Sequence, residues 1–176
     1  MAVLCDWEIK ARCNGGMVEN FDPDLVNPAS LDLRLGNGIM IESIYSPELI
    51  RVDISDTTED NPFMVQPGDF LLAETLEIFN LPNDISAQFV LKSSRARAGF
   101  NHMLAGWCDP GWHGSTLTLE LKNERQHHAD LSGDENRADG IPLNVERPGC
   151  ELRANRTLQQ PPNGYAERGV MCLPAL

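Results

Sequence analysis

Ser115-Thr116-Leu117-Thr118-Leu119-Glu120-Leu121 is the stretch that decides the fold class of this chain. Its leucines alternate with polar residues, which is the two-residue period of a half-buried β-strand. Several apolar, β-prone segments lie upstream, and Pro, Gly, Asn or Asp bound them in combinations typical of turns. The pattern predicts a mainly β protein, a sandwich or barrel with little helix.

The other expected strands occupy residues 30–35, 39–44, 70–78 and 85–91. In the first of them the leucines would face the core, and Ser30, Asp32 and Arg34 would face the solvent. Gly36-Asn37-Gly38 is expected to turn the chain into the second strand.

Two short helices are expected beside these strands. Residues 5–12 form an amphipathic pattern, with Asp6 as the expected N-cap and two glycines as the stop. Ser93-Ser94 would cap a second helix, because the alanines and arginines that follow favour helix.

Composition excludes several classes of protein. The 176 residues are 41% hydrophobic, which predicts one domain with a real core. A formal charge of −12 argues against a nucleic-acid surface, which needs a basic face. No apolar run approaches the roughly 20 residues of a membrane span, and residues 1–10 do not form a secretory signal.

The cysteines and histidines predict neither disulfides nor a metal site. The five cysteines are scattered and odd in number, no Cys-x-x-Cys occurs, and the four histidines complete no ligand spacing. Reduced thiols in a cytoplasmic protein are therefore expected.

The chemistry is expected around Lys92-Ser93-Ser94-Arg95-Ala96-Arg97-Ala98-Gly99-Phe100. Its hydroxyls and cations suit phosphate, and a helix beginning there would also suit phosphate. Glu120 on the polar face of a strand is most often only solvated. However, the turn Asp109-Pro110-Gly111 predicts a hairpin that brings Asp109 toward Glu120, and paired carboxylates beside a phosphate cradle outline a hydrolytic site. Trp112 would stack a base or fill the core.

Three strings in the same region resemble one family. They are Lys-Ser-Ser-x-Ala-Arg-x-Gly from Lys92, Asp-Pro-Gly-Trp-x-Gly from Asp109 and Thr-Leu-Glu-Leu-x-Asn from Thr118. Residues 21–35 and 66–72 match further segments in the same order. Over residues 4–123 the chain resembles the dCTP deaminases of the dUTPase-like trimeric superfamily.

The resemblance implies a dUTPase-like distorted β-sandwich or barrel that forms a homotrimer with active sites between subunits. It implies hydrolytic deamination of dCTP to dUTP and ammonia without zinc, with Mg²⁺ bound to the triphosphate and dTTP as a candidate feedback ligand. The His-x-Glu…Pro-Cys-x-x-Cys signature of zinc deaminases is absent. The alternatives are a dUTPase, a bifunctional dCTP deaminase-dUTPase and a non-catalytic nucleotide-binding trimer.

The resemblance also implies a role for each catalytic residue. Glu120 would activate water for attack on C4 of cytosine and then protonate the leaving amine. Ser93 and the backbone carbonyl of Ala105 would position that water, and Arg97 would polarise the base.

The implied substrate contacts lie close to these residues. Lys92 and Ser94 would meet the triphosphate, and Asp109 would accept a hydrogen bond from the 3′-hydroxyl. Trp112 belongs to the expected substrate-binding set, and no residue is expected to bind a metal.

The chain after His128 departs from the family. Residues 1–128 are predicted to form the nucleotide domain, and 129–176 an aberrant, poorly ordered tail without the family's closing strand and lid. When the codons from Ala129 are read one nucleotide later, a permissible choice restores a family-like Pro-Gly-Met-Arg-Ile-Gly-Gln string. A frameshift near His128 is therefore predicted, with a diverged tail as the alternative, and the coding DNA separates the two.

Overall fold

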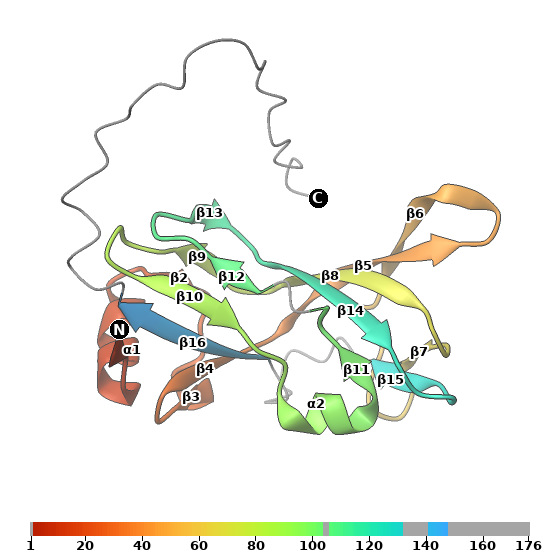
Figure 1. The fold of residues 1–176 in the computed structure, drawn as a ribbon, viewed down its shortest axis with the longest axis horizontal. Coiled ribbons are helices and arrows are strands. Elements are labelled where there is room, and N and C mark those ends of the chain that lie inside the picture. Colours follow the sequence, from red (N-terminus) through yellow and green to blue (C-terminus); the bar gives the residue numbers. More distant parts are fainter. Residues whose placement is uncertain (1, 104–105, 132–140, 148–176) are drawn as a thin grey trace, which may run out of the picture.

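The computed structural model describes the backbone of residues 2–103, 106–131 and 141–147. Antiparallel strands dominate this part of the chain, with one short helix near the N-terminus and one at the Lys-Ser-Ser motif (Figure 1). The helical segments are α1 (Asp6–Asn14), the 3₁₀ turn η1 (Pro23–Leu25) and α2 (Ser93–Ala98). The predicted mainly β, dUTPase-like fold class is confirmed.

The largest sheet carries α2 at the end of one of its strands. Its six strands are β1 (Ala2–Val3), β3 (Val26–Asn27), β4 (Ser30–Leu33), β10 (Ser86–Phe89), β12 (Trp107–Cys108) and β16 (Ile141–Arg147). They lie in the order β12-β10-β16-β4-β3, and β1 pairs with β16. Residues 90–92 connect β10 to α2 (Figure 1).

The second sheet carries Glu120. Its five strands are β5 (Leu35–Ser43), β6 (Ser46–Asp53), β8 (Phe70–Thr75), β11 (Phe100–Asn101) and β14 (Thr118–Asn123), in the order β11-β14-β8-β5-β6. Two smaller sheets complete the described fold. They pair β2 (Val18–Glu19) and β13 (His113–Ser115) with β9 (Ile78–Asn80), and β7 (Phe63–Val65) with β15 (Ala129–Leu131).

One apolar core joins the two large sheets. Leu31 and Phe89 come from the first sheet, and Leu71 and Leu119 from the second; each is at most 3% exposed. The alternation predicted around Leu119 is confirmed, since both neighbouring leucines of that face are also buried. None of the helices in the described segments has the length and apolar character needed to span a bilayer.

The predicted N-cap of the first helix and the predicted turn at residues 36–38 are both wrong. Asp6 is the first residue of α1, and Cys5 is its N-cap, because the Glu8 carboxylate reaches back to the Cys5 backbone N–H at 3.2 Å. Residues 36–38 do not turn the chain: β5 runs through them. Its pairing with β8 shifts between Leu35 and Ile39, so the glycines form an irregularity inside one strand.

The expectation of an irregular chain after Ala129 is wrong for two segments. Residues 129–131 form β15 against β7, and 141–147 form β16 between β10 and β4. Residues 141–147 carry the pattern of a strand, because Ile141, Leu143 and Val145 alternate with Pro142, Asn144 and Glu146. The other tail residues, 132–140 and 148–176, lie outside the described residues, so the predicted domain boundary and frameshift stay predictions.

Candidate active site

The Lys-Ser-Ser motif forms the beginning of α2. Lys92 is the N-cap residue in an extended conformation, and Gly99 ends the helix with a φ of 107°. A left-handed residue at this position satisfies the last helical carbonyls, and glycine adopts it without strain. A Cβ at Gly99 would also lie 2.2 Å from Cγ of Arg125, so the position has no room for a side chain.

Three predicted site residues of α2 point outward. Ser93, Ser94 and Arg97 are exposed. Their side chains make no hydrogen bond or ion pair within the described part of the chain. The helix therefore offers two hydroxyls and one guanidinium to a molecule from outside.

Glu120 lies in the middle of β14, opposite Leu72 of β8. Its neighbours Leu119 and Leu121 are buried in the core, so the carboxylate is on the other face of the sheet. On that face the row continues through Leu72 to Met40 of β5, both half-buried apolar side chains. Oε2 of Glu120 is buried and has no hydrogen-bond partner among the described residues.

An unpaired buried carboxylate oxygen is the most informative polar group in this structure. Leaving such a group unsatisfied costs about 1–3 kcal/mol, and more when it is charged. Buried polar atoms are nearly always paired in folded proteins, and the exceptions concentrate where water or a ligand completes the site. The environment of Glu120 therefore differs from that of a fully solvated surface carboxylate.

Asp109 and Trp112 lie in one tight turn. The backbone N–H of Trp112 donates to the carbonyl of Asp109 at 3.2 Å, and Gly111 between them has a φ of 85°. The Asp109 carboxylate accepts from the indole of Trp107 at 3.2 Å. Both tryptophans are exposed, at 54% for Trp107 and 41% for Trp112, which leaves their faces available for stacking.

The expected hairpin between Asp109 and Glu120 is wrong. The strand before Asp109, β12, pairs with β10, and the strand after the turn, β13, pairs with β9. β14 is occupied on both edges by β8 and β11, so no edge remains for β12. Asp109 thus lies in the turn that follows β12, and Glu120 lies in β14 of the other large sheet. Ala105, whose carbonyl was expected to hold the water, lies outside the described residues.

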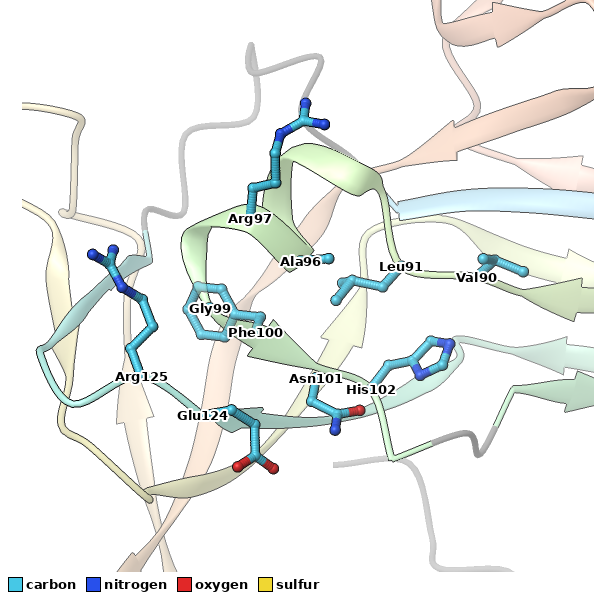
Figure 2. Close-up of a pocket in the computed structure, with 10 residues that line it drawn as sticks. All are labelled: Val90, Leu91, Ala96, Arg97, Gly99, Phe100, Asn101, His102, Glu124 and Arg125. Atoms are coloured by element: carbon cyan, nitrogen blue, oxygen red, sulfur yellow. The ribbon is translucent and has the colours of Figure 1, made fainter.

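A hollow of about 640 Å³ lies beside α2 and β11 (Figure 2). Such volumes are typical of small-molecule sites. Figure 2 shows Arg97 on the helix side and Arg125 on the strand side, with Phe100 between them and His102 farther along. Sequence reasoning missed His102 and Arg125, because their approach to α2 depends on the pairing of β11 with β14. Glu120 does not line this hollow.

Lys92, predicted to contact phosphate, is held by a carboxylate instead of pointing freely outward. Its Nζ lies 2.5 Å from Oδ2 of Asp32 on β4. A second buried pair joins the Arg34 guanidinium to Glu77 at 2.9 Å, and Glu77 is fully buried. Burial raises the pKa of Glu77, and the hydrogen bonds from Arg34 oppose that rise. These pairs tie the Ser-Leu-Asp-Leu-Arg segment to the rest of the fold.

Cys108, next to Asp109, is not an activated nucleophile. Burial raises the pKa of its thiol to about 11, and the charge of Asp109 adds to the rise. The thiolate is the reactive form, and it is scarce at neutral pH when the pKa is so high. Proton transfer by a carboxylate is the chemistry this site supports better.

The fold places this chain in the dUTPase-like class of mainly β proteins. The family of dCTP deaminase-like proteins matches residues 3–135, and the chain belongs to that family. Two of its relatives are named dCTP deaminase, dUMP-forming. That of Methanoculleus marisnigri is 41% identical over 131 residues, 69% of each chain. That of Methanospirillum hungatei is 35% identical over 166 residues, 88% of each chain.

A solved structure supports the fold. The 2′-deoxycytidine 5′-triphosphate deaminase from Agrobacterium tumefaciens superposes with a TM-score of 0.64 at 23% identity. The match covers 83% of this chain and 48% of that one, so this chain spans about half of the compared structure. At this identity the likeness shows that the two proteins share a fold.

Proposed function

We propose that this protein removes the amino group of dCTP by hydrolysis, with Glu120 as the residue that moves the protons. The observation that carries the proposal is that Oε2 of Glu120 is buried and has no hydrogen-bond partner in the described segments. Glu120 takes a proton from water as the water oxygen bonds to C4 of the cytosine. It then delivers a proton to N4, the C4–N4 bond breaks, and ammonia leaves. The balance is dCTP and water giving dUTP and ammonia.

We further propose that the reaction continues to dUMP. The relatives from Methanoculleus and Methanospirillum are both named as dUMP-forming enzymes, which favours the bifunctional alternative over release of dUTP. In the second step a water attacks the α-phosphorus and pyrophosphate leaves, so dUTP and water give dUMP and pyrophosphate. Both steps are hydrolyses, and each needs its own activated water.

The exposed end of α2 supports the proposed substrate contacts. Ser93 would orient the water together with the Ala105 carbonyl, and Arg97 would polarise the base. Ser94 and the partly exposed Lys92 would meet the triphosphate. Asp109 would take the 3′-hydroxyl.

Magnesium would enter as part of the substrate. Within the described segments no three His, Cys, Asp and Glu side chains gather as a metal site, so phosphate oxygens would hold the ion. Trp112 would flank the base from its turn. The proposed feedback ligand is dTTP, which carries the same sugar and triphosphate as dCTP.

The site is proposed to be shared between copies of the chain in a homotrimer. No hydrogen bond or ion pair joins Glu120 to Ser93 or Arg97 within the described residues, although the proposed chemistry needs them together. The exposed α2 of one copy would complete the half-buried face around Glu120 of the next.

The free thiols of Cys5 and Cys13 also suit the reducing cytoplasm, where we propose the enzyme works.

Incubation with dCTP, with ammonia and nucleotides measured together, tests the function. We expect one ammonia, one dUMP and one pyrophosphate per dCTP consumed. Accumulation of dUTP would restrict the enzyme to deamination. Pyrophosphate from added dUTP without ammonia from dCTP would identify a dUTPase and contradict the proposal. Binding of dCTP without any product would identify a non-catalytic protein and contradict it as well.

Subunit mixing tests the shared site. Arg97→Ala and Glu120→Gln should each be inactive alone, but a refolded equal mixture should recover about one quarter of the parent activity, because random trimers then contain one intact site in four. A mixture that stays inactive while forming trimers would place both residues in one subunit's site.

A further inference from the structure

Asp32 is a buried charged residue between two buried leucines. It lies in β4 between Leu31 and Leu33, and it is 5% exposed while each leucine is 1% exposed. The expectation that Asp32 faces the solvent is therefore wrong, because both faces of β4 are covered. A buried carboxylate is retained only where partners compensate its lost hydration.

Both oxygens of Asp32 have partners. Oδ1 accepts from the side-chain amide of Asn27 at 2.8 Å, and Oδ2 accepts from the Lys92 ammonium at 2.5 Å. Asn27 belongs to β3, the strand next to β4, so this contact is local. Lys92 is 60 positions away in the chain and is the last residue before α2.

The pair between Asp32 and Lys92 spans a strand. In the sheet, β16 lies between β10 and β4, and its Leu143 pairs with Phe89 while its Pro142 pairs with Asp32. The segment that leaves β10 after Phe89 therefore passes the end of β16 before α2 begins (Figure 1). The ion pair fastens that segment to β4 at this point.

Fastening Lys92 also fixes the first turn of α2. The backbone carbonyl of Lys92 accepts the N–H of Ala96 at 3.0 Å, which is the first hydrogen bond of the helix. Ser93 follows Lys92 directly, and Arg97 lies one turn later on the same short helix. A shift of Lys92 would move both residues together.

We infer that Asp32 is a positioning residue of the active site, acting through Lys92 to hold Ser93 and Arg97 in register. This inference rests on the proposed function. Asp32 is buried in β4 and contacts Lys92, so its effect on catalysis passes through that ammonium. Reacting groups displaced by about 1 Å can lose about a hundredfold in rate, so a loose α2 would be costly.

The test is a double-mutant cycle in the full chain, read by two independent measurements. Asp32→Asn removes the charge at nearly constant volume, Lys92→Met removes the partner, and the double variant removes both. Deamination of dCTP gives kcat and KM, and hydrogen exchange reports on the amides of Ala96 and Gly99 in α2. Glu77→Gln is the matched control, because it breaks a buried ion pair elsewhere in the sheet region.

We expect Asp32→Asn to lower kcat/KM by about tenfold or more, mainly through kcat, and to speed exchange of the α2 amides by about tenfold. The double variant should be no worse than the worse single variant. Glu77→Gln should leave both readouts within twofold, whatever it does to stability. Lys92→Arg should keep the α2 exchange slow, because its cation still reaches Asp32.

Three results would overturn the inference. The first is that Asp32→Asn leaves hydrogen exchange of the α2 amides unchanged. The second is that the kcat/KM of the double variant falls by the product of the two single losses. The third is that Glu77→Gln changes kcat/KM and exchange as much as Asp32→Asn does. Where Asp32→Asn does not fold, the exchange of Lys92→Met against Lys92→Arg decides, since the Lys92 side chain is 31% exposed and tolerates change. A parent protein that releases no ammonia contradicts the proposed function alone, because the exchange measurement still shows whether Asp32 holds α2.

Discussion

Glu120→Gln separates a catalytic carboxylate from a structural one. The substitution keeps the shape of the side chain and removes its charge and its exchangeable proton. Glu120 is assigned both the proton removal from water and the proton delivery to the amine, and each such step contributes about 10²–10⁴ in rate. The kcat for ammonia release should therefore fall by at least about 10³-fold.

The structure predicts that Glu120→Gln does not lower the free energy of unfolding, although it lowers kcat. Oε2 of Glu120 is buried and makes no hydrogen bond in the described residues, so the substitution breaks none at that atom. The free energy of unfolding should therefore stay within about 1 kcal/mol of the parent value. A catalytic loss without a loss of stability is the signature of a group kept for chemistry.

The assay is ammonia release from dCTP, with urea unfolding measured on the same preparations. Glu42→Gln on β5 is the control, because it makes the same change at an exposed position and should alter neither quantity. The reasoning fails if Glu120→Gln keeps kcat within tenfold of the parent. It fails equally if the variant loses more than about 1 kcal/mol of stability, which would mean that the carboxylate supports the fold.

Two further predictions concern the fold around the site. Gly99→Ala should lower the free energy of unfolding by about 1–3 kcal/mol, because the φ is 107° and the new Cβ would lie 2.2 Å from Cγ of Arg125. Adding Arg125→Ala should restore only part of it, and full recovery in urea unfolding would refute the strain. Because burial raises the pKa of Glu77 above 4.5, its contribution to stability should decline as pH rises through that raised pKa. The unfolding free energy of the parent relative to Glu77→Gln should then fall above pH 4.5, and a rise would contradict the direction.

Local sequence pattern was sufficient where neighbours in the chain supply the cause. The alternation around Leu119 identified the strand that carries Glu120, since one face of a strand must be apolar to be buried. The alanines and arginines after Ser93-Ser94 located the second helix, because they favour helix, although its N-cap is Lys92 and not either serine. Even here the cap of the first helix was misplaced by one residue: the N-cap is Cys5, whose backbone N–H donates to the Glu8 carboxylate.

Pairing across the sheets could not be read from those patterns. The strand before Asp109 was expected beside Glu120, yet it pairs with β10, because strand edges are filled by whichever segment the whole fold brings there. The same holds for the backbone of residues 141–147, which lies between β10 and β4 in the first sheet.

The sequence by itself thus determined the strand that bears Glu120, the helix that bears Ser93 and Arg97, and the family to which such motifs belong. Each depends on residues within one turn or one strand of one another. Only the tertiary structure decided that Oε2 of Glu120 is buried with no partner among residues 2–103, 106–131 and 141–147, and that Lys92 is held by Asp32. Burial and long-range ion pairs depend on segments as far as 60 positions apart, and no local pattern encodes them.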